Sequence, residues 1–110
     1  MTENKIVKLS SERKRAMRQI GHQLKPVVTI GDNGLSESVL VELDRALEDH
    51  ELIKVKLRVD DTRLIREAVL AHCNATLVQA VGNVVLVYRA AKEPDPKLSN
   101  LLRFQLTGKR

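Results

Sequence analysis

The chain has 110 residues, 43% of them apolar, and its 19 Lys and Arg against 14 Asp and Glu give a formal net charge of +5. This length fits one domain with one modest core, and the two aromatic residues, Tyr88 and Phe104, are too few for RNA binding by successive stacked bases, as in an RRM. One cysteine, Cys73, excludes an internal disulfide, and the lack of a long apolar run or a signal peptide predicts a soluble, cytoplasmic protein.

The positive charge is concentrated before residue 26. Seven basic residues in that stretch minus two acidic ones, Glu3 and Glu12, equal the whole net charge of +5; the seven are Lys5, Lys8, Arg13, Lys14, Arg15, Arg18 and Lys25. A local cationic field attracts polyanions. An ordinary solvated helix face explains the same residues, so the charge alone leaves both interpretations open.

The first predicted helix begins at Ser10 or Ser11 and ends at Gly21. Its apolar stripe contains Ala16, Met17 and Ile20, while its basic residues point mostly to water. A short β-branched run, Val27 to Ile30, then predicts a buried strand.

A glycine-bracketed turn follows this strand and leads directly into a second helix, for which Ser36 is the predicted N-cap. The glycine loop is Gly31-Asp32-Asn33-Gly34. A helix start presents free backbone N–H groups that suit an anion, and glycines let a sugar-phosphate come close. An ordinary tight turn is the alternative, because two glycines three apart also suit one. The loop lacks the Lys-Ser/Thr pair of a Walker A motif.

The second helix runs to about His50, and a strand with clean alternation follows from Leu52 to Val59. Its apolar residues alternate with Lys54, Lys56 and Arg58, which therefore share the open face. A solvated face is again the alternative, and three like charges make a nearby counter-charge plausible. Asp60, Asp61 or Thr62 then caps a third helix that stops near Asn74, and Gly82-Asn83 joins two strands, 77–81 and 84–88, as a hairpin.

The order of elements, helix-strand-helix-strand-helix-strand-strand, predicts a single α/β domain. We expect a four-stranded mixed sheet with helices mainly on one face and the basic strand residues on the uncovered side. The domain covers residues 1–92, and residues 93–110 form a C-terminal tail, flexible or docked, whose leucines and Phe104 have no predicted partner.

Catalytic and metal-binding patterns are poorly supported. His22, His50 and His72 are scattered, and no His or Cys pair has metal-ligand spacing. Cys73 is expected to fill the core rather than to act as a nucleophile. The sequence therefore predicts no enzyme, no metal and no cofactor.

Several motifs together resemble the CRM domain (chloroplast RNA splicing and ribosome maturation), and above all the small stand-alone YhbY-type proteins of bacteria. The similarity extends roughly from Ser10 to Arg89, through residues 21–28, 31–36, Glu42, 46–48, 50–56, 81–82 and 85–89. It implies a fold similar to the C-terminal domain of translation initiation factor three. It also implies RNA binding, association with precursors of the large ribosomal subunit and a role in ribosome assembly.

The expected ligand is therefore ribosomal RNA, held through its backbone by a monomer, with a weak dimer left open. The family's glycine-x-x-glycine loop falls on Gly31 to Gly34, where the acidic Asp32 is unfavourable near phosphate unless it turns inward, for example to cap the next helix. The predicted RNA-binding residues are Gly31, Asp32, Asn33, Gly34, Lys25, His22, Lys54, Lys56, Arg58, Lys14, Arg15 and Arg18. The alternative function is a protein-binding adaptor on the ribosome that uses the last strand or the tail.

Overall fold

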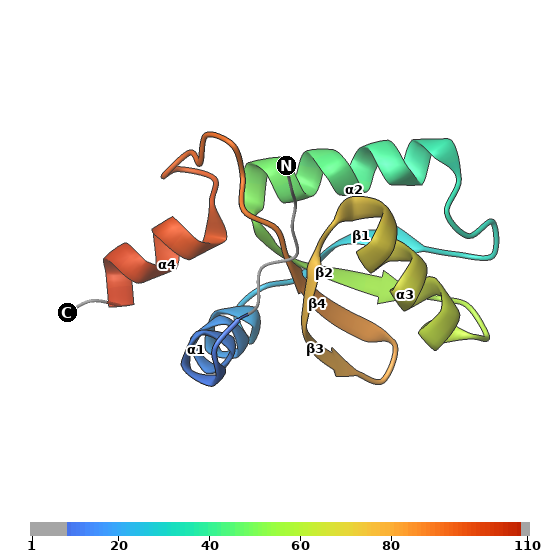
Figure 1. Cartoon of the computed structure of the whole chain (residues 1–110), viewed down its shortest axis with the longest axis horizontal. Helices are drawn as coiled ribbons and strands as arrows, with labels where there is room; N and C mark the ends of the chain where they lie inside the picture. Colours follow the sequence, from blue (N-terminus) through green and yellow to red (C-terminus); the bar gives the residue numbers. More distant parts are fainter. Residues whose placement is uncertain (1–8, 109–110) are drawn as a thin grey trace.

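The structure, a computed structural model, describes residues 9–108, with side chains described to Phe104; Lys5 and Lys8 lie outside this range. The elements are α1 (Ser11–Gly21), β1 (Pro26–Ile30), α2 (Glu37–His50), β2 (Leu52–Leu57), α3 (Thr62–Cys73), β3 (Thr76–Val81), β4 (Val84–Tyr88) and α4 (Asn100–Gly108) (Figure 1). The first seven follow the predicted order. The eighth, α4, was not predicted.

The four strands form one mixed sheet in the order β1-β2-β4-β3. β1 and β2 are parallel, and the two pairs that contain β4 are antiparallel. This arrangement confirms the predicted α/β fold with a four-stranded mixed sheet.

The helices begin and end where local side chains satisfy their free backbone groups. Ser10 Oγ accepts from the Arg13 amide at 3.1 Å, Ser36 Oγ from Val39 at 3.3 Å and Asp61 Oδ1 from Leu64 at 3.1 Å. These bonds confirm the predicted N-caps. α3 ends at Asn74 in the left-handed conformation, with φ 54°.

The main core lies between α2, α3 and one face of the sheet. Leu43 and Leu47 of α2 and Val69 of α3 are fully buried there, and Ile30, Ile53, Val55, Leu57, Val85 and Val87 meet them from the strands. Cys73 belongs to the same cluster and is 1% exposed, which confirms its predicted role as a core residue. Its burial, and then the nearby Asp44 carboxylate, raise the pKa of the thiol to about 11.

The opposite face, expected to be uncovered, carries α1 and α4 over part of its area (Figure 1). Met17 of α1 and Leu101 of α4 pack there against Leu52, Leu86 and Tyr88. A Cβ on Gly21 would lie 2.7 Å from Leu86 Cδ2, so any larger residue at this approach of α1 to the sheet would force the buried Leu86 side chain to shift. Met17 is buried, whereas Ala16, also placed on the apolar stripe, is exposed.

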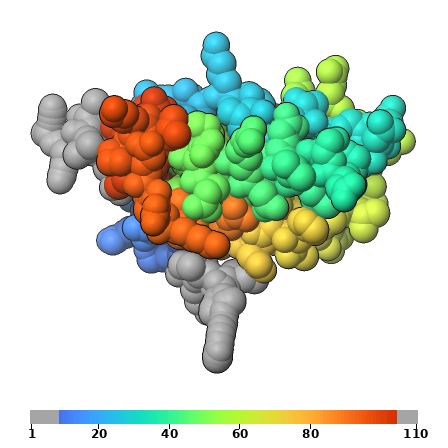
Figure 2. Space-filling view, turned by 90° about the horizontal axis from the view of Figure 1, so that it is seen from above, coloured from blue at the N-terminus to red at the C-terminus, as the bar shows by residue number. Residues whose placement is uncertain are grey.

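The segment that precedes α4 is anchored at the junction of α2 and β2. Glu51, 5% exposed and with φ 62°, accepts from the Ala91 amide at 2.8 Å and from Ser99 Oγ at 2.6 Å. Asn100 Nδ2 donates to the Leu52 carbonyl at 2.7 Å. As a result, the tail lies beside the C-terminal end of α2 (Figure 2). Within residues 9–108, no helix has the length and apolar character that crossing a membrane requires.

Candidate nucleic-acid interface

The glycine loop forms a tight turn between β1 and α2. The Gly34 amide donates to the Gly31 carbonyl at 2.9 Å, and the Ser36 amide donates to the Gly34 carbonyl at 3.1 Å. Gly34 has φ +66°, a conformation that favours glycine, whereas a Cβ on Gly31 would meet no atom within 4 Å. The two glycines therefore differ: Gly34 is needed by the turn itself, and Gly31 leaves its outer surface open.

The exposed tip of this loop consists of Asp32 and Asn33. In the part of the chain that the structure describes, no protein oxygen accepts from the amides of these two residues. Ser36 caps α2, so the Asp32 carboxylate does not serve as the cap. Any loop contact to a phosphate would therefore use the Asp32 and Asn33 amides, since the Gly34 amide is already bonded within the turn.

Two cations of β2, Lys54 and Lys56, and the loop meet along one face of the parallel pair, and Arg58 follows directly after β2, which ends at Leu57 and not at Val59 as predicted. Lys54 lies opposite Pro26, which follows Lys25, and Lys56 lies opposite Thr29. The Arg58 amide donates to the Ile30 carbonyl at 2.7 Å, which places Arg58 next to Gly31. The cationic row, defined as Lys25, Lys54, Lys56 and Arg58, thus leads along the β1–β2 pair to the glycine loop.

This row lies on the face of the sheet that also carries α1 and α4, in the part those helices leave open. Val27, which shares this face, is 49% exposed, and Val81 at the far edge of the sheet is 63% exposed. Among residues 9–104 no carboxylate lies within 4.0 Å of the row, so the counter-charge considered plausible from the sequence is not found there. The row is available to an external anion.

The remaining predicted cations form a separate stripe on α1. Lys14, Arg18 and His22 are spaced four residues apart and lie on one side of the helix, with Arg15 exposed beside them. His22 is the C-cap of α1, and its amide donates to the Arg18 carbonyl at 3.1 Å. The structure therefore gathers the predicted residues into a row on the strands and a stripe on α1.

Arg89, by contrast, has its partners within the domain. Its guanidinium contacts Asp44 at 2.9 Å and Glu48 at 3.8 Å and donates to the Cys73 carbonyl at 3.2 Å. It thereby ties α2 to the end of α3. Within residues 9–108, no group of three or more His, Cys, Asp or Glu side chains could hold a metal ion.

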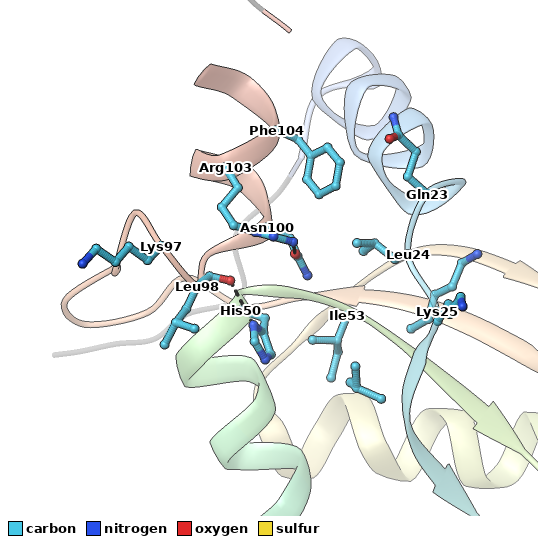
Figure 3. A pocket seen from close by; sticks show the side chains of 12 residues that line it. Gln23, Leu24, Lys25, His50, Ile53, Lys97, Leu98, Asn100, Arg103 and Phe104 are labelled. Carbon is cyan, nitrogen blue, oxygen red and sulfur yellow. Dashed lines mark hydrogen bonds between the residues drawn. The ribbon is translucent and has the colours of Figure 1, made fainter. Parts of the chain in front are cut away.

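A cavity of about 330 Å³ lies at the other end of the cationic row, between the start of β1, the end of α2 and α4 (Figure 3). Lys25 and Lys54 line it together with Lys97, Arg103 and Phe104 of the tail. Sequence reasoning missed these three tail residues. The interleaving of basic residues with leucines after Pro96 was the available signal, but it gave no partner for the tail.

Comparisons with known proteins give one family match and several relatives. The CRS1/YhbY (CRM) domain matches residues 9–89. A probable RNA-binding protein of Pseudomonas aeruginosa is 48% identical over 99 residues, which cover 87% of this chain and 95% of that protein. An RNA-binding protein of Haemophilus influenzae is 41% identical, with 82% of this chain and 94% of that protein covered. The solution structure of a hypothetical protein from Staphylococcus aureus, described as a candidate RNA-binding protein, superposes with a TM-score of 0.67 at 30% identity, covering 84% of this chain and 98% of the other.

Proposed function

Because the chain belongs to the CRS1/YhbY (CRM) domain family, we propose that it is an RNA-binding protein that associates with ribosomal RNA of large-subunit precursors and assists ribosome assembly. The observation that carries the RNA proposal is the cationic row, which has no carboxylate partner among residues 9–104 and ends beside the glycine loop. A ribosomal RNA ligand would also place the protein in the cytoplasm. The proposed role is binding by a monomer, without a chemical step.

The row would hold the RNA backbone. Lysine and arginine side chains neutralise phosphates, and such contacts fix the position of the RNA without reading its sequence. The exposed amides of Asp32 and Asn33 would accept one further phosphate at the end of the row, and the α1 stripe would extend the contact. Specificity would then come from RNA shape and from 2′-hydroxyl groups.

The adaptor function remains the alternative and has weaker support. Leu101 of the tail is 6% exposed because it packs into the second core of its own domain. Leu101 is therefore not available to a partner, and an adaptor that docks through the tail would have to use other side chains of the tail. The last strand, β4, lies between β2 and β3, so it offers no edge to a partner as the adaptor prediction required. The outer edge of β3, which has no strand partner in the described part of the chain, is the surface that an adaptor could use instead.

Salt dependence tests the cationic row directly. For a single-stranded RNA, each neutralised phosphate contributes roughly 0.7 to the slope of log K against log salt. Replacing Lys54 and Lys56 together by Gln should therefore lower the slope by about 1.4 and weaken binding at low salt. Arg45→Gln is the matched control, since Arg45 is an exposed cation on α2, beyond the other face of the sheet.

An unchanged slope in the double variant would remove the row from the RNA site. The identity of the RNA needs a separate experiment: in-cell crosslinking followed by sequencing of the attached RNA. Enrichment of large-subunit ribosomal RNA is the expected result. Enrichment of unrelated transcripts would overturn the ribosomal part of the proposal while leaving RNA binding intact.

A further inference from the structure

The cavity beside α4 combines an apolar floor with a cationic rim. Leu24 contributes apolar surface from the domain and Phe104 contributes its ring from the tail (Figure 3), and the exposed side chain of Val27 also lines the cavity. Its volume of about 330 Å³ lies at the lower end of the range for small-molecule sites. The chemistry therefore suits a small ring system rather than an extended segment.

The charges that line this cavity all have one sign. Lys25, Lys54, Lys97 and Arg103 are present, and among residues 9–104 no Asp or Glu lines the cavity. The nearby carboxylate of Glu51 is bonded to the Ala91 amide and to Ser99 Oγ. A ligand that complements this site has an apolar, planar part and a negative charge.

The tail wall of the cavity is held in place by hydrogen bonds to the domain. Leu98 presents its carbonyl oxygen to His50 Nδ1 at 2.9 Å, and Asn100 is bonded to Leu52. Arg103 Nη2 donates to Asn100 Oδ1 at 2.7 Å, and the guanidinium carbon lies 5.1 Å from the centre of the Phe104 ring. The site is thus preformed, which lowers the entropic cost of binding.

We infer that this cavity takes one unpaired nucleotide of the bound RNA, with its base against the Phe104 wall and its phosphate at Lys25 and Lys54. This inference rests on the proposed RNA function and adds a second contact to it. Lys54 and Lys56 lie on the same face of β2, so an RNA strand on the cationic row reaches the cavity without leaving the protein surface. The tail is then part of the RNA site. Tyr88, the other aromatic residue, is buried and unavailable for this role.

The test uses two RNA hairpins that differ by one unpaired nucleotide, a bulged 2-aminopurine. The full chain should bind the bulged hairpin at least about fivefold more tightly, the lower end expected for one stacked base, and should change the 2-aminopurine fluorescence. Phe104→Leu and Arg103→Gln should each reduce the preference for the bulge and leave affinity for the paired hairpin nearly unchanged. Lys92→Gln, a tail cation outside the cavity, is the matched control and should keep the preference.

Each other result overturns the inference in a distinguishable way. If both hairpins bind and the Phe104→Leu variant keeps the wild-type preference, or if the wild type has no preference, the cavity does not hold a nucleotide although RNA binding stands. If free adenosine monophosphate competes for the bulge signal at comparable concentration, the ligand is a free mononucleotide. If neither hairpin binds, the proposed function fails as well.

Discussion

The two glycines of the loop should respond differently to the same substitution, because only one has a special backbone conformation. Gly34→Ala places a Cβ on a residue with φ +66°, at an ordinary 3.9 Å from Ile65 Cδ1, so the penalty is conformational and not steric. A left-handed L-residue costs about 1–2 kcal/mol, and the stiffer unfolded chain offsets about 0.4–1 kcal/mol of it. The expected net loss in the free energy of unfolding is about 1 kcal/mol.

Gly31→Ala is the matched control for this loss. No atom lies within 4 Å of the added Cβ, so stability should stay unchanged or rise slightly. Urea denaturation of the three proteins measures the difference through the midpoint at constant m. If the two variants were equally stable, the assignment of distinct roles to the two glycines would be wrong.

The same pair separates stability from binding. If a phosphate approaches the open surface at Gly31, a side chain there should obstruct it, so Gly31→Val should weaken RNA binding more than its effect on stability explains. Titration of a structured RNA at constant salt measures this. Full affinity in a well-folded Gly31→Val variant would show that close approach at Gly31 is not needed.

Three further outcomes follow from the packing. Gly21→Ala should lower stability by about 1 kcal/mol, because overpacking against Leu86 at 2.7 Å exceeds the gain in helix propensity, and Leu86→Val should relieve part of this loss. Both carboxylate oxygens of Glu51 accept hydrogen bonds, and in Glu51→Gln one of them is replaced by an NH2 group that faces a donor. The free energy of unfolding should fall by about 1–3 kcal/mol, and amide hydrogen exchange in α4, measured by mass spectrometry, should become faster. The pKa of the Cys73 thiol is raised from 9.0 to about 11 in the folded state, so folding favours the protonated thiol. The free energy of unfolding should therefore be constant below pH 9.0 and fall as pH rises toward about 11, by at most roughly 2.7 kcal/mol. Cys73→Ala should remove this dependence on alkaline pH. The difference in the free energy of unfolding between wild type and Cys73→Ala should therefore become smaller as pH rises.

Each of these has a result that would contradict it. A Gly21→Ala variant as stable as wild type would mean that Leu86 moves aside freely. If amide exchange in α4 of the Glu51→Gln variant were no faster than in wild type, the Glu51 carboxylate would not anchor the tail. Parallel pH profiles of wild type and Cys73→Ala would show that the thiol does not titrate within this range.

Local signals in the sequence were enough for most of the domain. The alternation on β2, the serine caps and the Gly82-Asn83 turn each depend on neighbours within a few residues, and the structure confirms them. The strand-helix order fixed the parallel β1–β2 pair, which brought Lys54 and Lys56 together with the glycine loop.

The packing of α1 and α4 on the second face of the sheet was harder to predict. An alternating pattern shows which residues of a strand share a face, but it does not show which helix packs over that face. A signal was nevertheless present: Val85 to Tyr88 is an uninterrupted apolar run, and all four residues are buried. Such a run indicates a strand covered on both faces. The docking of the tail depends on the hydrogen bonds from Ser99 to Glu51 and from Asn100 to Leu52. Each bond joins residues 48 positions apart, so no local sequence pattern predicts it.

The position of β4 has a consequence for how the chain is made. Although it is the last of the four strands of this sheet to be synthesised, β4 lies between β2 and β3. Until residue 88 leaves the ribosome, the backbone edge of β2 has no partner, and α4 arrives later still to complete the second core. Folding of this domain should therefore wait until β4 and then α4 have left the ribosome, and a nascent chain stalled before β4 should expose a strand edge to chaperones or to self-association.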